Sequence, residues 1–148
     1  MSKNEKNNLK LIGKNQEDLK VISAYIQDSV VAVKDITFLE KNRIFVMIVN
    51  RFMWEDVEKG LNRKNKRIRS AIKFEEVLSV KSKKINQQNR NKLLECLAIK
   101  CNESSKNYEI NFFFSGEGVL TLISESIEVV LHDLGESWDV KHIPKHKI

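Results

Sequence analysis

The sequence predicts an α+β domain in which a mainly antiparallel sheet or half-barrel of about six or seven strands carries one N-terminal and one C-terminal helix. Two observations predict the sheet. Residues 30–52 and 108–123 each contain a pair of apolar runs joined by a tight polar or glycine-bearing turn. A third observation, the amphipathic pattern over residues 16–27, predicts the N-terminal helix.

The length and composition indicate one domain, over residues 9–140. With 148 residues, 41% of them hydrophobic, the chain can bury one core but not two comfortable ones. Residues 1–8 read as a disordered tail and residues 141–148 as a basic irregular tail. Since no apolar run is long enough to span a membrane and the N-terminus lacks the apolar centre of a signal peptide, we expect a cytoplasmic protein without membrane contact.

The N-terminal part predicts a short edge strand at residues 9–12 and a helix at 16–27. Asn15 stands at the N-cap position, and acidic residues follow in the first turn. Leu19, Ile22 and Ile26 then repeat at the three- and four-residue spacing of one helix face.

The two hairpins give the clearest strand signals. In the first, Ile36 and Phe38 share one face, residues 40–43 form the turn, and the return run at 44–49 is apolar on both faces, as in a central strand. In the second, apolar and polar residues alternate from Tyr108, and the turn at 115–118 contains two glycines. Further strands are predicted from Arg67, from Val77 and over residues 93–101.

The last element, residues 127–134, fits two patterns. A helix capped by Ser124 and stopped by Gly135 fits the apolar spacing, whereas alternation around Val129 fits a strand. We favour the helix, because only the helix explains Leu134 and the position of Gly135.

The sequence shows no constellation of residues that predicts catalysis, a cofactor or a metal. Phosphate-binding glycine loops, dinucleotide fingerprints and paired C-x-x-C clusters are missing from it. His142 and His146 have a spacing that binds metal only on a helix, and Pro144 lies between them. Cys96 and Cys101 are predicted as reduced thiols on opposite faces of one strand, because an odd separation reverses direction. We therefore expect a protein that is not an enzyme.

The basic residues carry the functional hypothesis. The formal net charge is +6, and cations concentrate before and within the strand from Arg67 and at the end of the strand from Val77. If these strands pair through Glu75 and Glu76, both groups share one sheet edge that attracts phosphate backbones. The predicted contacts are Arg63, Lys64, Arg67, Arg69, Lys81, Lys83 and Lys84.

The leading hypothesis is thus a non-enzymatic binding module whose basic sheet edge contacts RNA, a ribonucleoprotein or an anionic protein. A protein-interaction or homodimerisation module, using an exposed strand or the region of Phe52 and Trp54, is the alternative. An enzyme of unknown type comes third. The structural explanation of the same cations is a solvated strand face whose lysines protect an edge from aggregation.

Several short segments also carry a resemblance to known sequences. They are LKLI (9–12), EDL (17–19), VISA (21–24), QDSVV (27–31), NRF (50–52), WE (54–55), VLSV (77–80), LAI (97–99), Ile127, Leu131, DLG (133–135) and Trp138. In these the chain resembles a family of small uncharacterised alphaproteobacterial proteins known by a domain-of-unknown-function label. The resemblance implies a bacterial cytoplasmic protein and no known activity.

Overall fold

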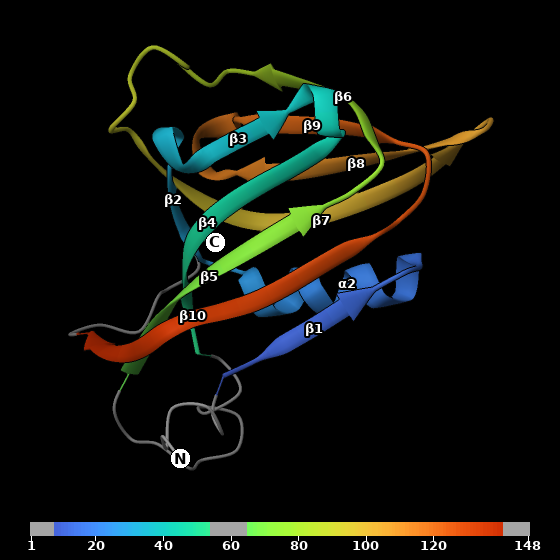
Figure 1. The fold of residues 1–148 in the computed structure, drawn as a ribbon. Coiled ribbons are helices and arrows are strands. Elements are labelled where there is room, and N and C mark those ends of the chain that lie inside the picture. Colours follow the sequence, from blue (N-terminus) through green and yellow to red (C-terminus); the bar gives the residue numbers. More distant parts are fainter. Residues whose placement is uncertain (1–7, 54–64, 141–148) are drawn as a thin grey trace.

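The computed structural model describes residues 8–53 and 65–140 (Figure 1). Its strands and α-helix are β1 (Lys10–Gly13), α2 (Gln16–Ile26), β2 (Val30–Ala32), β3 (Ile36–Leu39), β4 (Ile44–Phe52), β5 (Asn65–Phe74), β6 (Val77–Lys83), β7 (Leu93–Ser104), β8 (Asn107–Phe114), β9 (Val119–Ser124) and β10 (Val129–Val140). Three short 3₁₀ turns, η1 (Val33–Asp35), η2 (Glu40–Asn42) and η3 (Ser115–Glu117), connect some of them.

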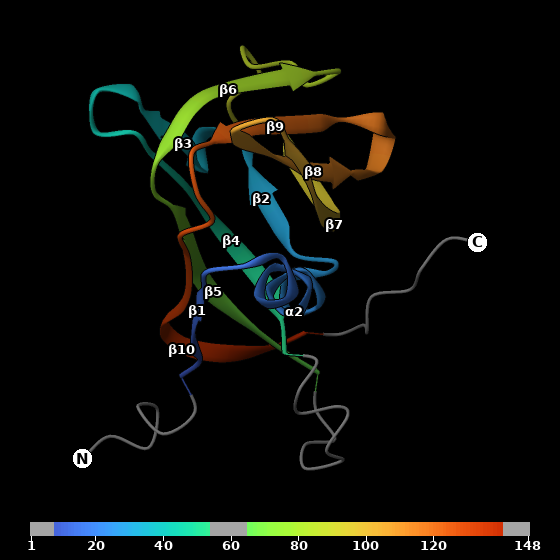
Figure 2. The ribbon, with the colours of Figure 1, turned by 90° about the vertical axis from the view of Figure 1, so that its right-hand side faces the viewer.

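The described strands form one antiparallel sheet of ten strands. Its order is β1-β10-β5-β4-β2-β7-β8-β9-β6, and β3 pairs with β4 beside this path. The sheet curls around its own apolar face, and α2 lies in the hollow, seen end-on in Figure 2. No helix in the described part of the chain is long and apolar enough to cross a membrane.

The predicted fold class is wrong in two respects. The described residues form ten strands instead of six or seven, and the predicted C-terminal helix at 127–134 is absent. Part of the difference comes from short strands such as β2, which joins β4 to β7 and which the sequence pattern did not separate from its neighbours.

Residues 129–140 form strand β10, which lies between β1 and β5. Ile127, Val129, Leu131 and Asp133 are all buried, which is the two-residue period of a strand. Pairing on both sides satisfies the backbone that a helix would have satisfied internally. Gly135 has a φ of 69° and lies at a shift in the β10–β5 register, so it serves an irregularity in the strand and not a helix end.

Helix α2 confirms the prediction for this segment. The Asn15 side chain caps its N-terminus by accepting a hydrogen bond from the backbone N–H of Asp18 at 2.8 Å. Leu19, Ile22 and Ile26 are buried against the sheet. The short strand predicted before it is confirmed as β1, which pairs with β10.

Both predicted hairpins are confirmed. β3 pairs with β4, and Arg43 at the turn adopts a left-handed conformation with a φ of 57°. β8 pairs with β9 over residues 108–113 and 119–124. β4 is central, as its two apolar faces predicted, because it contacts β3, β2 and β5.

The core lies between α2 and the two halves of the curled sheet. One half contains β4, β5 and β10, and the other contains β6, β8 and β9. Phe45 of β4, Phe74 of β5 and Phe112 of β8 meet at its centre, with ring centroids 5.6–6.4 Å apart. Contacts of this kind add to the free energy gained by burying the rings. They join strands from both halves of the sheet.

Candidate functional site

The cations predicted to share one sheet edge lie on two strands that do not pair. β5 pairs with β4 and β10, whereas β6 pairs with β9. Glu75 and Glu76 therefore form a corner between the two halves of the sheet and not a hairpin turn. In Figures 1 and 2, β6 lies at the top and the start of β5 at the bottom. The structure separates the predicted residues accordingly, and Arg63 and Lys64 lie outside the described residues.

Arg67 is held by the protein itself. Its Nη1 donates hydrogen bonds to the carbonyl oxygens of Asp28 at 3.2 Å and Asn50 at 3.0 Å, and its guanidinium lies 5.9 Å from the centre of the Phe52 ring. Burial lowers the pKa of Arg67, while the charges of Asp28 and Glu95 act in the opposite direction. The half-buried side chain thus links three neighbouring segments and is not a free phosphate contact.

Arg69 faces solvent on the outer side of β5, on the same face as Lys73, as the alternation predicted. Its neighbours across the strands are Leu134 and Asn50. The two cations are four residues apart on one strand, or about 13 Å at the rise of an extended chain. They are too far apart to form a compact cationic site on their own.

The remaining predicted cations lie on β6, the last strand of the sheet path. Lys81 and Lys83 are exposed on the outer face, opposite Thr121 and Val119 of β9. Lys84 follows them and pairs with Glu117 at 3.1 Å. Arg90, in the loop after β6, borders the same cleft as the strand. We call Lys81, Lys83, Lys84 and Arg90 the basic edge.

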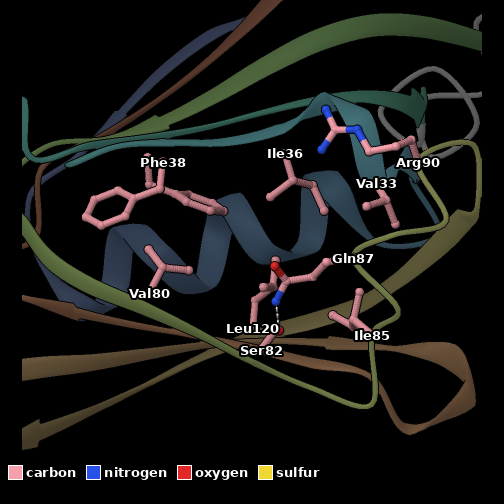
Figure 3. A pocket seen from close by; sticks show the side chains of 10 residues that line it. Val33, Ile36, Phe38, Val80, Ser82, Ile85, Gln87, Arg90 and Leu120 are labelled. Atoms are coloured by element: carbon pink, nitrogen blue, oxygen red, sulfur yellow. Dashed lines mark hydrogen bonds between the residues drawn. The ribbon is translucent and has the colours of Figure 1, made fainter.

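An apolar cleft opens between β3 and β6, beside the basic edge. Its volume is about 230 Å³. Val33, Ile36 and Phe38 lie on one side, and Val80, Ile85 and Leu120 face them from the other (Figure 3). Phe45, Ser82, Gln87 and Arg90 complete the lining.

The cleft exists because the curled sheet does not close at this point. Within the described chain, β3 pairs only with β4 and β6 only with β9. Backbone hydrogen bonds close both ends of the gap: Lys34 N–H donates to the Arg90 carbonyl at one end, and Val77 N–H donates to the Arg43 carbonyl at the other, each at 2.9 Å. Between these ends, two strand edges face the cleft.

The polar groups of the cleft come from β6 and the loop after it. Gln87 Nε2 donates a hydrogen bond to Ser82 Oγ at 2.6 Å, as the dashed line in Figure 3 marks. Among the described residues of the lining, Arg90 is the only charged one. Lys81, Lys83 and Arg90 make no ion pair within the part of the chain that the structure describes.

A buried ion pair that the sequence analysis missed lies far from this cleft. Arg51 of β4 donates two hydrogen bonds to Asp133 of β10, from Nε at 2.9 Å and from Nη2 at 2.8 Å, and both side chains are fully buried. Ser70 Oγ and the backbone N–H of Leu9 also donate to this carboxylate, at 2.6 and 2.9 Å. The Tyr25 ring covers the guanidinium.

The contacts around Asp133 favour its charged form. Burial alone would raise the pKa of Asp133, but the hydrogen bonds and charge of Arg51, with Ser70 and Leu9, outweigh burial and hold the pKa below its ordinary value. A carboxylate so fully bonded has no free position for proton transfer. The alternation of β4 indicates an inward Arg51, because Arg51 continues the inward positions of Phe45 and Met47. Its partner Asp133 was missed because residues 127–134 were predicted to form a helix.

The two cysteines lie on the same face of β7 and not on opposite faces. A register shift between Cys96 and Ala98 inserts one residue, so that Cys96 pairs with Phe114 and Cys101 with Ile110, both inward. Burial, with the charge of Asp28, raises the pKa of Cys96 to about 12, and burial with the charge of Glu103 raises that of Cys101. Both are free thiols.

Metal-ligating residues do not gather in the described chain. Residues 8–53 and 65–140 contain no group of three or more histidine, cysteine or acidic side chains placed to hold an ion. His132 is exposed, and the predicted pair of His142 and His146 lies outside the described residues.

Together these features define the class of the protein. The described residues form a curled antiparallel β-sheet domain with one internal helix, a cleft between β3 and β6, and the basic edge beside that cleft. Residues 9–146 match the model of a family described as proteins of unknown function, DUF2948. The chain belongs to this family, which confirms the predicted resemblance to a domain of unknown function. No curated protein matches the chain.

Proposed function

We propose that this protein is a non-enzymatic binding module that meets an anionic partner at the basic edge, with RNA or a ribonucleoprotein as the first candidate. The observation that carries the proposal is the set of exposed cations on the edge strand β6 and in the loop after it, where Lys81, Lys83 and Arg90 make no ion pair with the described residues. Such cations bind phosphates by releasing counterions, and this binding is indifferent to base sequence.

The position of the cations on the sheet supports binding more than the net charge alone does. Lys81 and Lys83 point outward from a strand that pairs on one side only, and Arg90 lies across the cleft mouth from it. Described aromatic rings do not line the basic edge itself, so base stacking contributes little there. The expected partner surface is therefore a phosphate backbone or a row of carboxylates.

The proposal is tested by charge reversal with a matched control. In the variant K81E/K83E two cations of the basic edge are reversed, and in the control R69E/K73E two cations on the outer face of β5 are reversed. Both variants lower the formal net charge of +6 by the same amount. Fluorescence anisotropy with a labelled single-stranded RNA of about 20 nucleotides measures affinity between about 50 and 200 mM salt.

We expect the affinity of the wild-type protein to fall steeply with salt and the affinity of K81E/K83E to be at least about tenfold lower at 50 mM. The control variant should retain most of the affinity. Equal losses in the two variants would show only an effect of net charge and would reject the basic edge as the site. A wild-type affinity that does not change with salt concentration would reject the proposal as a whole.

A further inference from the structure

We infer that the cleft between β3 and β6 receives an apolar side chain from an acidic, extended polypeptide segment. This inference rests on the proposed function that the basic edge meets an anionic partner, and it takes an acidic protein segment, instead of RNA, as the partner that also uses the cleft. In this inference the cleft holds the apolar anchor side chain, and the neighbouring cations contact the carboxylates that flank it.

The lining of the cleft determines the chemistry of the anchor. Ile36, Phe38, Val80 and Leu120 present apolar surface to the same space (Figure 3). An apolar group that packs against these side chains gains free energy by burial, while Ser82, Gln87 and Arg90 supply the polar part of the lining. A leucine or phenylalanine side chain matches the apolar part, whereas ribose and phosphate bring little apolar surface to it.

The size of the cleft favours a side chain over a free small molecule. Its volume of about 230 Å³ lies below the usual range of about 300–1,000 Å³ for small-molecule sites. One large apolar side chain uses such a space well, and its main chain then lies at the mouth. There the edges of β3 and β6 that pair with no other described strand offer backbone N–H and C=O groups to an extended segment.

Charge complementarity determines the sign of the partner. Arg90 is the only charged residue that the structure describes in the cleft lining, and Lys81 and Lys83 lie on the adjoining strand. Carboxylates beside the anchor would meet these cations, while a second copy of this chain would bring another +6 of net charge to the same place. An acidic segment of another protein therefore fits better than self-association.

The test uses two labelled synthetic peptides of about nine residues, rich in glutamate and aspartate, that differ only in a central leucine or serine. Protein variants separate the two parts of the site. In Q87W an exposed side chain at the cleft is enlarged to block it, and in Q88W the same change is made at the next exposed position, which does not line the cleft. K81E/K83E removes cations and leaves the cleft open.

We expect the wild-type protein to bind the leucine peptide about tenfold or more tightly than the serine peptide. Q87W should abolish this difference, Q88W should keep it, and K81E/K83E should weaken both peptides together. Thermal melting of each variant verifies folding, and both tryptophans are at exposed loop positions.

The outcomes separate the two hypotheses. Equal binding of both peptides to the wild type, with loss of both in K81E/K83E, would overturn the anchor pocket and leave the basic edge standing. Binding of both peptides that is unchanged in K81E/K83E would show that the basic edge does not contact the flanking carboxylates and would overturn this inference, whereas the RNA measurement tests the proposed function separately. A concentration-dependent mass that Q87W abolishes would show a second copy of the chain in the cleft and reject the acidic segment.

Discussion

Arg51 and Asp133 form the most constrained polar contact among the described residues, and their role is to fix the arrangement of strands. The pair joins β4 to β10, and Ser70 and Leu9 attach β5 and the segment before β1 to the same carboxylate. Burying two charges costs desolvation energy that their attraction only partly offsets. The benefit is specificity of register, because a one-residue slip of β10 would turn Asp133 to the other face of the sheet and take its charge away from the buried Arg51.

Asp133 gives a prediction at this scale. Its pKa is lowered in the folded state, so its contribution to stability is present above the ordinary range near pH 4 and is lost as pH falls through the lowered value. D133N should lower the free energy of unfolding at pH 7 by about 3–5 kcal/mol, because the buried Arg51 loses the charge of Asp133. Its stability should also depend less on pH in the acid range.

Urea unfolding of both proteins between about pH 7 and pH 3 measures these effects. D35N is the control, because Asp35 is half-buried and makes no ion pair with the described residues, so a change below about 0.5 kcal/mol is expected. Parallel pH profiles of the wild type and D133N would contradict the assigned role of Asp133.

At the scale of elements, the N-terminus of helix α2 is stabilised by hydrogen bonds between neighbouring residues. The Asn15 side chain accepts from Asp18 N–H, and the Asp18 carboxylate in turn accepts from Lys14 N–H at 2.9 Å. Both contacts satisfy backbone donors in and just before the first turn. The helix packs Leu19, Ile22 and Ile26 into the hollow of the sheet, so its stability is linked to the core.

N15A should therefore lower the free energy of unfolding by about 1 kcal/mol through the loss of this cap. Thermal or urea unfolding measures the change. N91A is the control, since Asn91 is exposed in a loop and forms no hydrogen bond with the described residues. A loss no larger than that of N91A would show that the cap adds nothing to stability.

The whole molecule is held together by contacts between residues far apart in sequence. β1 near the start of the chain pairs with β10 near its end, and β2 pairs with β7. Such contacts form only after long loops close, which slows folding. The cleft between β3 and β6 belongs to the same scale, because within the described residues β3 pairs only with β4 and β6 only with β9.

We expect the protein to refold in milliseconds to seconds, as other domains with mainly non-local strand pairing do. Stopped-flow refolding from urea, followed by intrinsic fluorescence, measures the main phase. A microsecond relaxation would mean that local structure dominates the barrier, and it would contradict this account of the sheet.

Elements with local signals could be predicted from the sequence. Helix α2 and its Asn15 cap, the β3–β4 hairpin and the β8–β9 hairpin follow from spacing and turn chemistry within about 20 residues. The alternation that places Arg67, Arg69 and Lys73 on the outer side of β5 was also readable. In each case neighbouring residues supply the partners that decide the structure.

Features that depend on distant partners could not be predicted and are set by the folded sheet. Residues 127–134 fit a helix and a strand, and pairing with β1 and β5 selected the strand. The same long-range pairing separated β5 from β6, brought Asp133 to Arg51 and left the cleft beside the basic edge. Side-chain periodicity specifies which face is apolar but not which strand lies next to it, because hydrophobic burial is non-directional and strand order is a property of the whole sheet.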